Sequence, residues 1–270
     1  MNSITVTNET NTTKTAINEI RIDFPSNGLV LRNHEVALNR LDLYHSWYNI
    51  STNFNNKQFA YIYNGTSYNV TMPDGFYDYT DIDYFMKQTM SDNGHYMLDQ
   101  NGEAVYFVHL DKNTTYYGVT LSLDVITTPA GGSNPNSMVT GTTMQLVISN
   151  NGFQDIIGVN AGTYPIGPSL TKYAFNSSKV PILSPVTTIH CTLSCVSNPF
   201  NRFTDQVYTF SPNKSYSSFL SYEPFQPVFY KAIDGSYTNL RLQFFDQSYR
   251  PLELIDKTSI TAVLLFRSTV

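Results

Sequence analysis

Four carboxylates gather in one short stretch of the chain, at Asp74, Asp78, Asp81 and Asp83. Two carboxyl groups about 5–10 Å apart across a cleft can hydrolyse a glycosidic bond, and several carboxylate oxygens from one loop can bind calcium. The EF-hand spacing is absent, however, and Asp81 and Asp83 suit the first turn of a helix, where the macrodipole favours anions. We expect a structural role for the cluster. A hydrolase that uses Asp74, Asp78 and Asp81 is the alternative.

The spacing of the histidines and cysteines gives little indication of metal binding or redox chemistry. None of the five histidines has the spacing of a metal-binding motif: His34, His45, His95, His109 and His190. Cys191 and Cys195 alternate on one face of a strand-like run, about 13 Å apart, which is too far for a disulfide. We expect both thiols to be reduced and in the core. No phosphate-binding, dinucleotide-binding or nucleophile-elbow motif occurs, so we expect no enzyme activity, no cofactor and no metal.

Aromatic residues are the remaining feature with binding chemistry. They often stand next to one another, at Tyr44, Trp47, Tyr48, Tyr77, Tyr79, Tyr116 and Tyr117. Adjacent strand residues face opposite ways, so one of each neighbouring pair should lie at the surface or at an interface. We predict Trp47, Tyr48, Tyr77 and Tyr79 as candidate contacts to a receptor or a glycan. Ordinary packing in a tyrosine-rich sheet is the alternative.

Composition limits the class of protein. The chain has 270 residues, only 14% of them charged, with a net charge of −5. It has no cluster of lysine and arginine, so we expect no direct nucleic-acid binding. No run of about 18 apolar residues occurs, so we expect no membrane span, and the start of the chain lacks the apolar segment of a signal peptide.

Turn signals divide the chain into short strands. Asn64-Gly65, Asn101-Gly102 and Asp234-Gly235 each separate two segments rich in strand-forming residues. Such dipeptides are the strongest local signal for a two-residue hairpin. We therefore predict three hairpins and an antiparallel, all-β chain.

Alternation of apolar and polar residues locates the strands and one irregularity. In the segment 35–44, Val36 and Leu38 are even-numbered and Leu41 and Leu43 odd-numbered, which predicts a bulge near Asn39-Arg40. The segment 259–266 is apolar on both faces, which predicts a central strand or one covered by a neighbour.

One helix is predicted after Thr80, which would be its N-cap with Asp83 completing a capping box. The apolar stripe at helical spacing consists of Ile82, Phe85, Met86 and Met90. Asn93-Gly94 should end the helix. A single helical turn is also expected at residues 153–157.

The order of these elements predicts the domains. Two strand-like segments precede residue 47 and six follow residue 185, and eight is the strand count of a jelly roll. We predict an antiparallel jelly-roll β-sandwich from residues 17–46 and 186–270. Residues 47–185 would form a large β-rich insertion that contains the short helix, and the polar residues 1–16 a flexible N-terminal arm.

Several segments resemble the capsid proteins of polinton, virophage and adintovirus-like double-stranded DNA viruses. They are His45–Asn56, Tyr68–Tyr77, Asp81-Ile82, Asn93–Tyr96, Asp234–Tyr237, Leu242–Gln247, Pro251-Leu252 and Ile260–Phe266. Together they reach from about residue 20 to residue 267. Major capsid proteins of this group are double jelly rolls of about twice this length, so the resemblance favours the minor capsid protein, or penton.

The resemblance implies a function and partners. A penton of this kind is a single jelly roll that forms a homopentamer at the icosahedral vertex of the virion, beside the major capsid protein. It carries no catalytic residues, and it would assemble in the cytoplasm or nucleus of the host cell. A host receptor or glycan is a further expected partner. The alternatives are a carbohydrate- or receptor-binding β-sandwich and a jelly-roll subunit of the major-capsid type.

Overall fold

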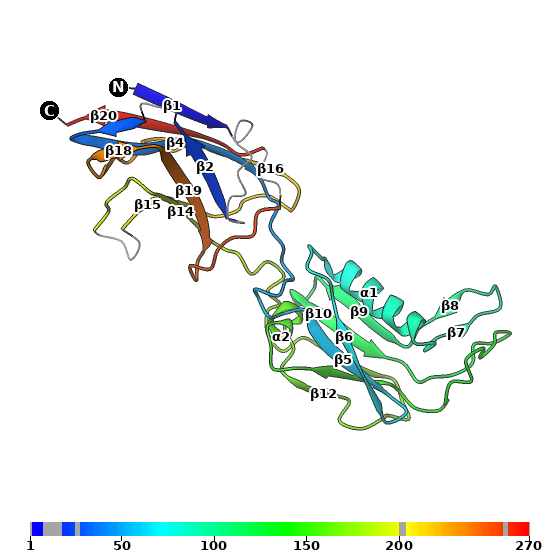
Figure 1. The fold of residues 1–270 in the computed structure, drawn as a ribbon. Coiled ribbons are helices and arrows are strands. Elements are labelled where there is room, and N and C mark those ends of the chain that lie inside the picture. The colour runs from blue at the N-terminus through cyan, green and yellow to red at the C-terminus, as the bar shows by residue number, and fades with distance from the viewer. Residues whose placement is uncertain (1, 8–17, 25–27, 200–203, 256–258, 270) are drawn as a thin grey trace. The chain divides into compact units, whose positions relative to one another are not determined.

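The computed structural model describes residues 2–7, 18–24, 28–199, 204–255 and 259–269. The chain forms two compact units (Figure 1). Unit 1 contains residues 1–47 and 186–270, and unit 2 contains residues 48–185. None of the helices in the described ranges has both the length and the apolar character needed to cross a bilayer.

Unit 1 contains two antiparallel sheets of long strands. In the first sheet the order is β1-β20-β4-β16, and β17 pairs with the other end of β4. These strands span Asn2–Thr7, Thr261–Ser268, His34–Tyr44, Phe219–Tyr222 and Tyr230–Lys231, respectively. In the second sheet the order is β15-β14-β19-β2. These strands span Gln206–Phe210, Ile189–Leu193, Asn239–Asp246 and Glu19–Asp23.

The pairing order of unit 1 is that of a jelly roll. Counted along the chain, the eight long strands are β1, β2, β4, β14, β15, β16, β19 and β20. The first pairs with the eighth, the second with the seventh, the third with the sixth and the fourth with the fifth. Strands that pair in this nested order wrap into two facing four-stranded sheets, which is the jelly-roll arrangement. The predicted fold class is confirmed.

Both sheets of unit 1 bury one face. Along β19, Leu240, Leu242 and Phe244 are buried and alternate with more exposed residues. Along β20, Ala262 and Leu264 are buried in the same way. This period of two places one row of apolar side chains from each strand between the sheets.

Residues 2–7 correct the expectation of a flexible arm over residues 1–16. They form strand β1, which pairs in register with β20 from Asn2–Phe266 to Thr7–Thr261. Threonine and β-branched residues favour extended backbone, and β20 offers an unpaired edge that only the tertiary fold creates. The rest of the predicted arm, residues 8–16, lies outside the described residues. The eighth long strand is thus β1, and not a sixth long strand after residue 185 as expected.

The predicted bulge and central strand are confirmed. Across β4 and β20, Val263 pairs with Arg40 while the next residue, Leu264, pairs with Leu38. Asn39 is therefore the extra residue, and the bulge lets β4 keep apolar residues inward on both sides of it. Strand β20 lies between β1 and β4 and is therefore a central strand of its sheet, as predicted.

Two of the three predicted hairpins form. Asn64-Gly65 joins β5 (Gln58–Tyr63) to β6 (Thr66–Thr71), with positive φ at both residues. A hairpin also joins β7 (Met97–Leu98) to β8 (Ala104–Val105) around Asn101-Gly102, but through the five residues 99–103 and not through the expected two-residue turn. The prediction of a hairpin at Asp234-Gly235 is wrong. There β18 (Gly235–Tyr237) pairs with β3 (Leu29–Leu31), and the Asp234 carboxylate accepts a hydrogen bond from the Asn33 amide at 2.8 Å.

Besides the β7–β8 hairpin, unit 2 contains two larger sheets and both helices of the described residues. One sheet has the order β12-β11-β5-β6 and the other β13-β10-β9. The new strands are β9 (Val108–Asn113), β10 (Gly118–Leu123), β11 (Gln145–Ile148), β12 (Gly162–Tyr164) and β13 (Tyr173–Asn176). Helix α1 (Tyr79–Asp92) packs beside β9 (Figure 1). The predicted helical turn is α2 (Phe153–Ile157).

The N-cap of helix α1 lies two residues before the predicted one. Asp78, and not Thr80, is the N-cap, and its side chain accepts from the Asp81 amide at 2.8 Å. The Asp81 carboxylate accepts in turn from the Asp78 amide, which completes the box with aspartates at both positions. The predicted apolar stripe is correct, since Ile82, Met86 and Met90 are buried in the core of unit 2.

Removal of residues 1–7 tests the role of β1. We expect this deletion to lower the free energy of unfolding by roughly 2–4 kcal/mol, because it removes a six-residue ladder whose hydrogen bonds contribute about 0.5–1.5 kcal/mol each. The measurement is urea unfolding followed by circular dichroism. A deletion variant as stable as the full chain would contradict this pairing and would support the original expectation of a flexible arm.

Candidate binding pocket

The carboxylates that could do hydrolytic chemistry are held by structural partners. Asp74 lies 2.7 Å from the Lys57 ammonium and also accepts from Thr52. Burial disfavours the charged form of Asp74, but these hydrogen bonds outweigh it and hold the pKa of its carboxyl below the usual value. Asp78 and Asp81 form the capping box of α1. Asp83 pairs with Lys87 and accepts from the Leu110 amide at 2.9 Å, which ties α1 to β9.

The predicted aromatic contacts do not form one platform. Trp47 belongs to unit 1, is only 2% exposed and stacks on His45 with a centroid distance of 4.0 Å. Its ring is therefore not exposed to a ligand. Tyr48 and Tyr77 are half-buried in unit 2. The Tyr77 hydroxyl donates to the Pro73 carbonyl at 3.0 Å, and burial raises its pKa.

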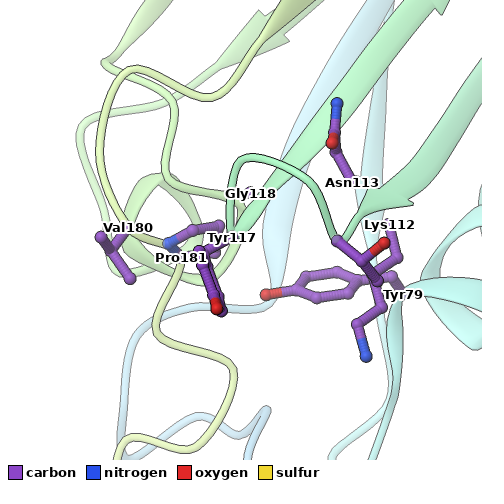
Figure 2. A pocket seen from close by; sticks show the side chains of 8 residues that line it. Tyr79, Lys112, Asn113, Tyr117, Gly118, Val180 and Pro181 are labelled. Carbon is purple, nitrogen blue, oxygen red and sulfur yellow. The ribbon is translucent and has the colours of Figure 1, made fainter.

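Tyr79, another of the predicted contacts, lines a pocket. The pocket has a volume of about 370 Å³ and lies wholly in unit 2. Its lining residues are Tyr79, Lys112, Asn113, Thr114, Tyr117, Gly118, Val180 and Pro181 (Figure 2). The Tyr79 hydroxyl donates to the Ile156 carbonyl at 3.3 Å, and burial raises the pKa of this phenol to about 12. The Tyr79 side chain is thus uncharged near neutral pH, and this hydrogen bond holds its ring in one position in the pocket lining.

Three segments far apart in the sequence form this pocket. Tyr79 is the first residue of α1, residues 112–118 cross from β9 through a turn into β10, and residues 180–181 follow β13. Sequence reasoning noted the neighbouring tyrosines at 116 and 117, but it missed Lys112 and Pro181. No local pattern signals them, since only the tertiary fold brings residue 181 beside residue 79.

Gly158 allows the segment that contains Val180 and Pro181 to lie close to the end of α2. Gly158 ends α2 with φ of +67°. A Cβ atom there would overlap the Lys179 carbonyl oxygen and lie 3.0 Å from Pro181. The Lys179 amide donates to the Gly158 carbonyl at 3.0 Å, and the Ile182 amide to the Asp155 carbonyl at 2.8 Å. These bonds fix Val180 and Pro181 as the wall opposite Lys112.

The cysteines are buried thiols, as the sequence predicts. Cys191 and Cys195 are both free and buried in unit 1. Burial raises the pKa of the Cys191 thiol and raises that of Cys195 to about 12, so neither is a thiolate near neutral pH. Among the described residues, no group of three histidine, cysteine, aspartate or glutamate side chains is placed to hold a metal ion.

His95 is enclosed by tyrosines. Its Nδ1 atom lies 2.8 Å from the Tyr61 hydroxyl, and its ring centroid lies 4.4 Å from that of Tyr63 and 4.6 Å from that of Tyr68. Burial in this aromatic cluster lowers the pKa of His95. Protonation of His95 would therefore oppose folding of unit 2.

Comparison with known proteins gives fold-level likenesses. No protein-family model and no curated protein matches the chain. The chain is similar to the crystal structure of the mavirus penton protein, with 11% sequence identity, 98% of each chain covered and a TM-score of 0.49. It is also similar to a chain in the cryo-EM structure of the Sputnik virophage, with 12% identity, 99% of this chain and 97% of that chain covered, and a TM-score of 0.45. Function does not follow from likeness at this level of identity.

The aromatic cluster predicts a pH dependence of stability. The pKa of His95 is lower in the folded chain than its ordinary value of 6.5, so below about pH 6.5 the unfolded chain binds more protons. We expect the free energy of unfolding to be fully present above that pH and to fall as the pH decreases below it. Urea unfolding between about pH 8 and about pH 5 measures this.

The variant His95→Gln keeps an acceptor for the Tyr61 hydroxyl and cannot be protonated. We expect its stability to fall less with acidity than that of the wild type. Burial also lowers the pKa values of His45 and His190, so part of the decrease should persist. His34→Gln, outside this aromatic cluster, is the control for a change of histidine to glutamine. Equal losses in His95→Gln and the wild type would contradict this account of His95.

Proposed function

We propose that this chain is a structural subunit of a virus capsid, of the single jelly-roll, penton type. The observation that carries the proposal is the nested pairing of eight strands in unit 1, from β1 with β20 to β14 with β15. Jelly rolls of this kind build viral capsids, and they also occur in lectins and cupins. The sequence segments that resemble polinton, virophage and adintovirus-like capsid proteins favour the capsid among these.

The number of jelly rolls supports a penton over a major capsid protein. The described residues form one eight-stranded sandwich, and unit 2 has different sheets and its own core. The resemblance implies two jelly rolls for a major capsid protein of this group. The proposed role is non-enzymatic, with assembly in the host cell and residence in the virion.

The surface of unit 1 supports assembly with other subunits. Strand β16 lies at the edge of its sheet, and Phe225, in the segment that follows, is fully exposed. Val228 is 61% exposed, and Phe219 and Tyr44 form an edge-to-face pair that is partly exposed. Exposed apolar side chains on and after an edge strand are typical of a surface that another protein covers. We propose that neighbouring copies in a homopentamer, or the major capsid protein, cover it.

Light scattering across a concentration series tests self-assembly. We expect the purified chain to form a species of about five times its 30.5 kDa mass as the concentration increases. A closed assembly of another size, or a monomer at every concentration, would contradict the homopentamer.

Substitutions at the exposed edge test where the subunits meet. We expect Phe225→Ser combined with Val228→Ser to shift assembly to concentrations about tenfold higher or more, because both side chains lose apolar contact area. Thermal unfolding of the monomer should be unchanged, since both residues are exposed. Ile166→Ser is the control, because Ile166 is 96% exposed but belongs to unit 2. Equal assembly by the double variant and the control would place the interface elsewhere.

A further inference from the structure

We propose that the pocket of unit 2 binds a carboxylated pyranose, such as a sialic acid or a uronic acid. The pocket has a volume of about 370 Å³, which lies in the range of about 300–1,000 Å³ for small-molecule sites. All its lining residues belong to unit 2. The inference therefore holds for the single chain and does not depend on capsid assembly.

The walls of the pocket suit the apolar face of a sugar ring. Tyr79 lies between the Lys112 side and the side formed by Tyr117 and Pro181 (Figure 2). Two phenol rings and the Pro181 ring give flat apolar surfaces on which the C–H face of a pyranose can stack. Val180, 74% exposed, extends this apolar wall. Stacking alone selects no particular sugar, so the polar groups must set the ligand class.

Lys112 favours a ligand with a negative charge. Three other lysines of unit 2 each pair with a carboxylate, at Lys57–Asp74, Lys87–Asp83 and Lys172–Asp124. Within the described part of the chain, Lys112 and Lys179 have no such ion pair, and of these two lysines it is Lys112 that lines the pocket. An ammonium beside an apolar wall binds a carboxylate with a charge-assisted hydrogen bond. With a neutral sugar in the pocket, the Lys112 ammonium would have only water as a partner.

The rim of the pocket can bind sugar hydroxyls. Thr114 and Tyr117 bring hydroxyl groups to the pocket, and no side-chain hydrogen bond to another described residue engages either of them. Asn113 has a different role, because its amide nitrogen donates to Thr120 at 3.0 Å and to Asn176 at 3.2 Å. Asn113 fixes the turn, while Thr114 and Tyr117 remain available to a ligand.

The backbone at Tyr117 holds this ring over the pocket. Its φ is +48°, a left-handed conformation that favours glycine or asparagine and is uncommon for a bulky side chain. Tyr117 is also 83% exposed, so burial in the core does not explain the tyrosine. Strain of this kind is typical of binding sites, where it places a side chain for a ligand.

Saturation-transfer NMR on the full chain tests the proposal with three probes. These are the methyl glycoside of N-acetylneuraminic acid, methyl glucuronide and methyl glucoside. Methyl glucoside matches the glucuronide but lacks the carboxylate. We expect at least one acidic probe to bind about tenfold more tightly than methyl glucoside, as one charge-assisted hydrogen bond would give. The two acidic arms distinguish a sialic acid from a uronic acid.

Two variants locate the binding. Lys112→Met should weaken the acidic probe to the level of methyl glucoside. Tyr117→Gly should abolish stacking and keep the fold, because glycine adopts the left-handed conformation without strain. Lys172→Met and Tyr116→Ala are the controls, since both residues are exposed in unit 2 but do not line the pocket. Both controls should bind as the wild type does.

Three results would overturn the proposal. They are no binding of either acidic probe, binding of neither acidic probe more tightly than methyl glucoside, and binding that Lys112→Met and Tyr117→Gly leave unchanged. Circular dichroism of each variant confirms that the fold is retained, so that a loss of binding reports on the pocket.

Discussion

The pairing of β20 with both β1 and β4 is the interaction on which unit 1 depends. It brings residues 261–268 between residues 2–7 and 34–42, so the first and the last strand of unit 1 pair at one side of the sheet, where β1 is the edge strand. The other three strand pairs, β2 with β19, β4 with β16 and β14 with β15, are nested in the sequence inside the β1–β20 pair. The bulge at Asn39 lets β4 follow β20 along its whole length while its apolar residues still face the core. Contacts between residues so far apart in the sequence can form only when residues 261–268 are present.

The connection from β4 to β14 explains how a second unit can share the chain. Strand β4 lies in one sheet and β14 in the other, and all of unit 2 falls between them. Unit 2 has its own core, in which α1 packs on β9 through buried residues such as Met86. Its pocket is built from turns and strand ends, where side chains can change without altering that core. The proposed assembly surface and the proposed ligand pocket therefore lie in different units.

Local patterns in the sequence predicted the elements whose partners are near in the chain. Asn64-Gly65 formed the expected hairpin because its two strands are neighbours, and the apolar stripe of α1 faced the core because helical spacing alone determines it. Asp234-Gly235 carries the same turn signal, but β3 pairs with the residues that follow it. Residues 2–7 were expected to be a flexible arm because the edge that receives them, β20, lies more than 250 residues away. The pocket was missed for the same reason, since Lys112 and Pro181 meet only in three dimensions.

Electron cryo-microscopy of the oligomer formed by the purified chain tests the central claim most directly, because one map shows both the strand order and the symmetry. We predict a five-fold ring in which each copy contains the eight-stranded sandwich, with residues 2–7 beside β20. A ring of another order would contradict the proposed vertex subunit. A sandwich in which another segment occupies the edge of β20 would contradict the fold on which that proposal depends.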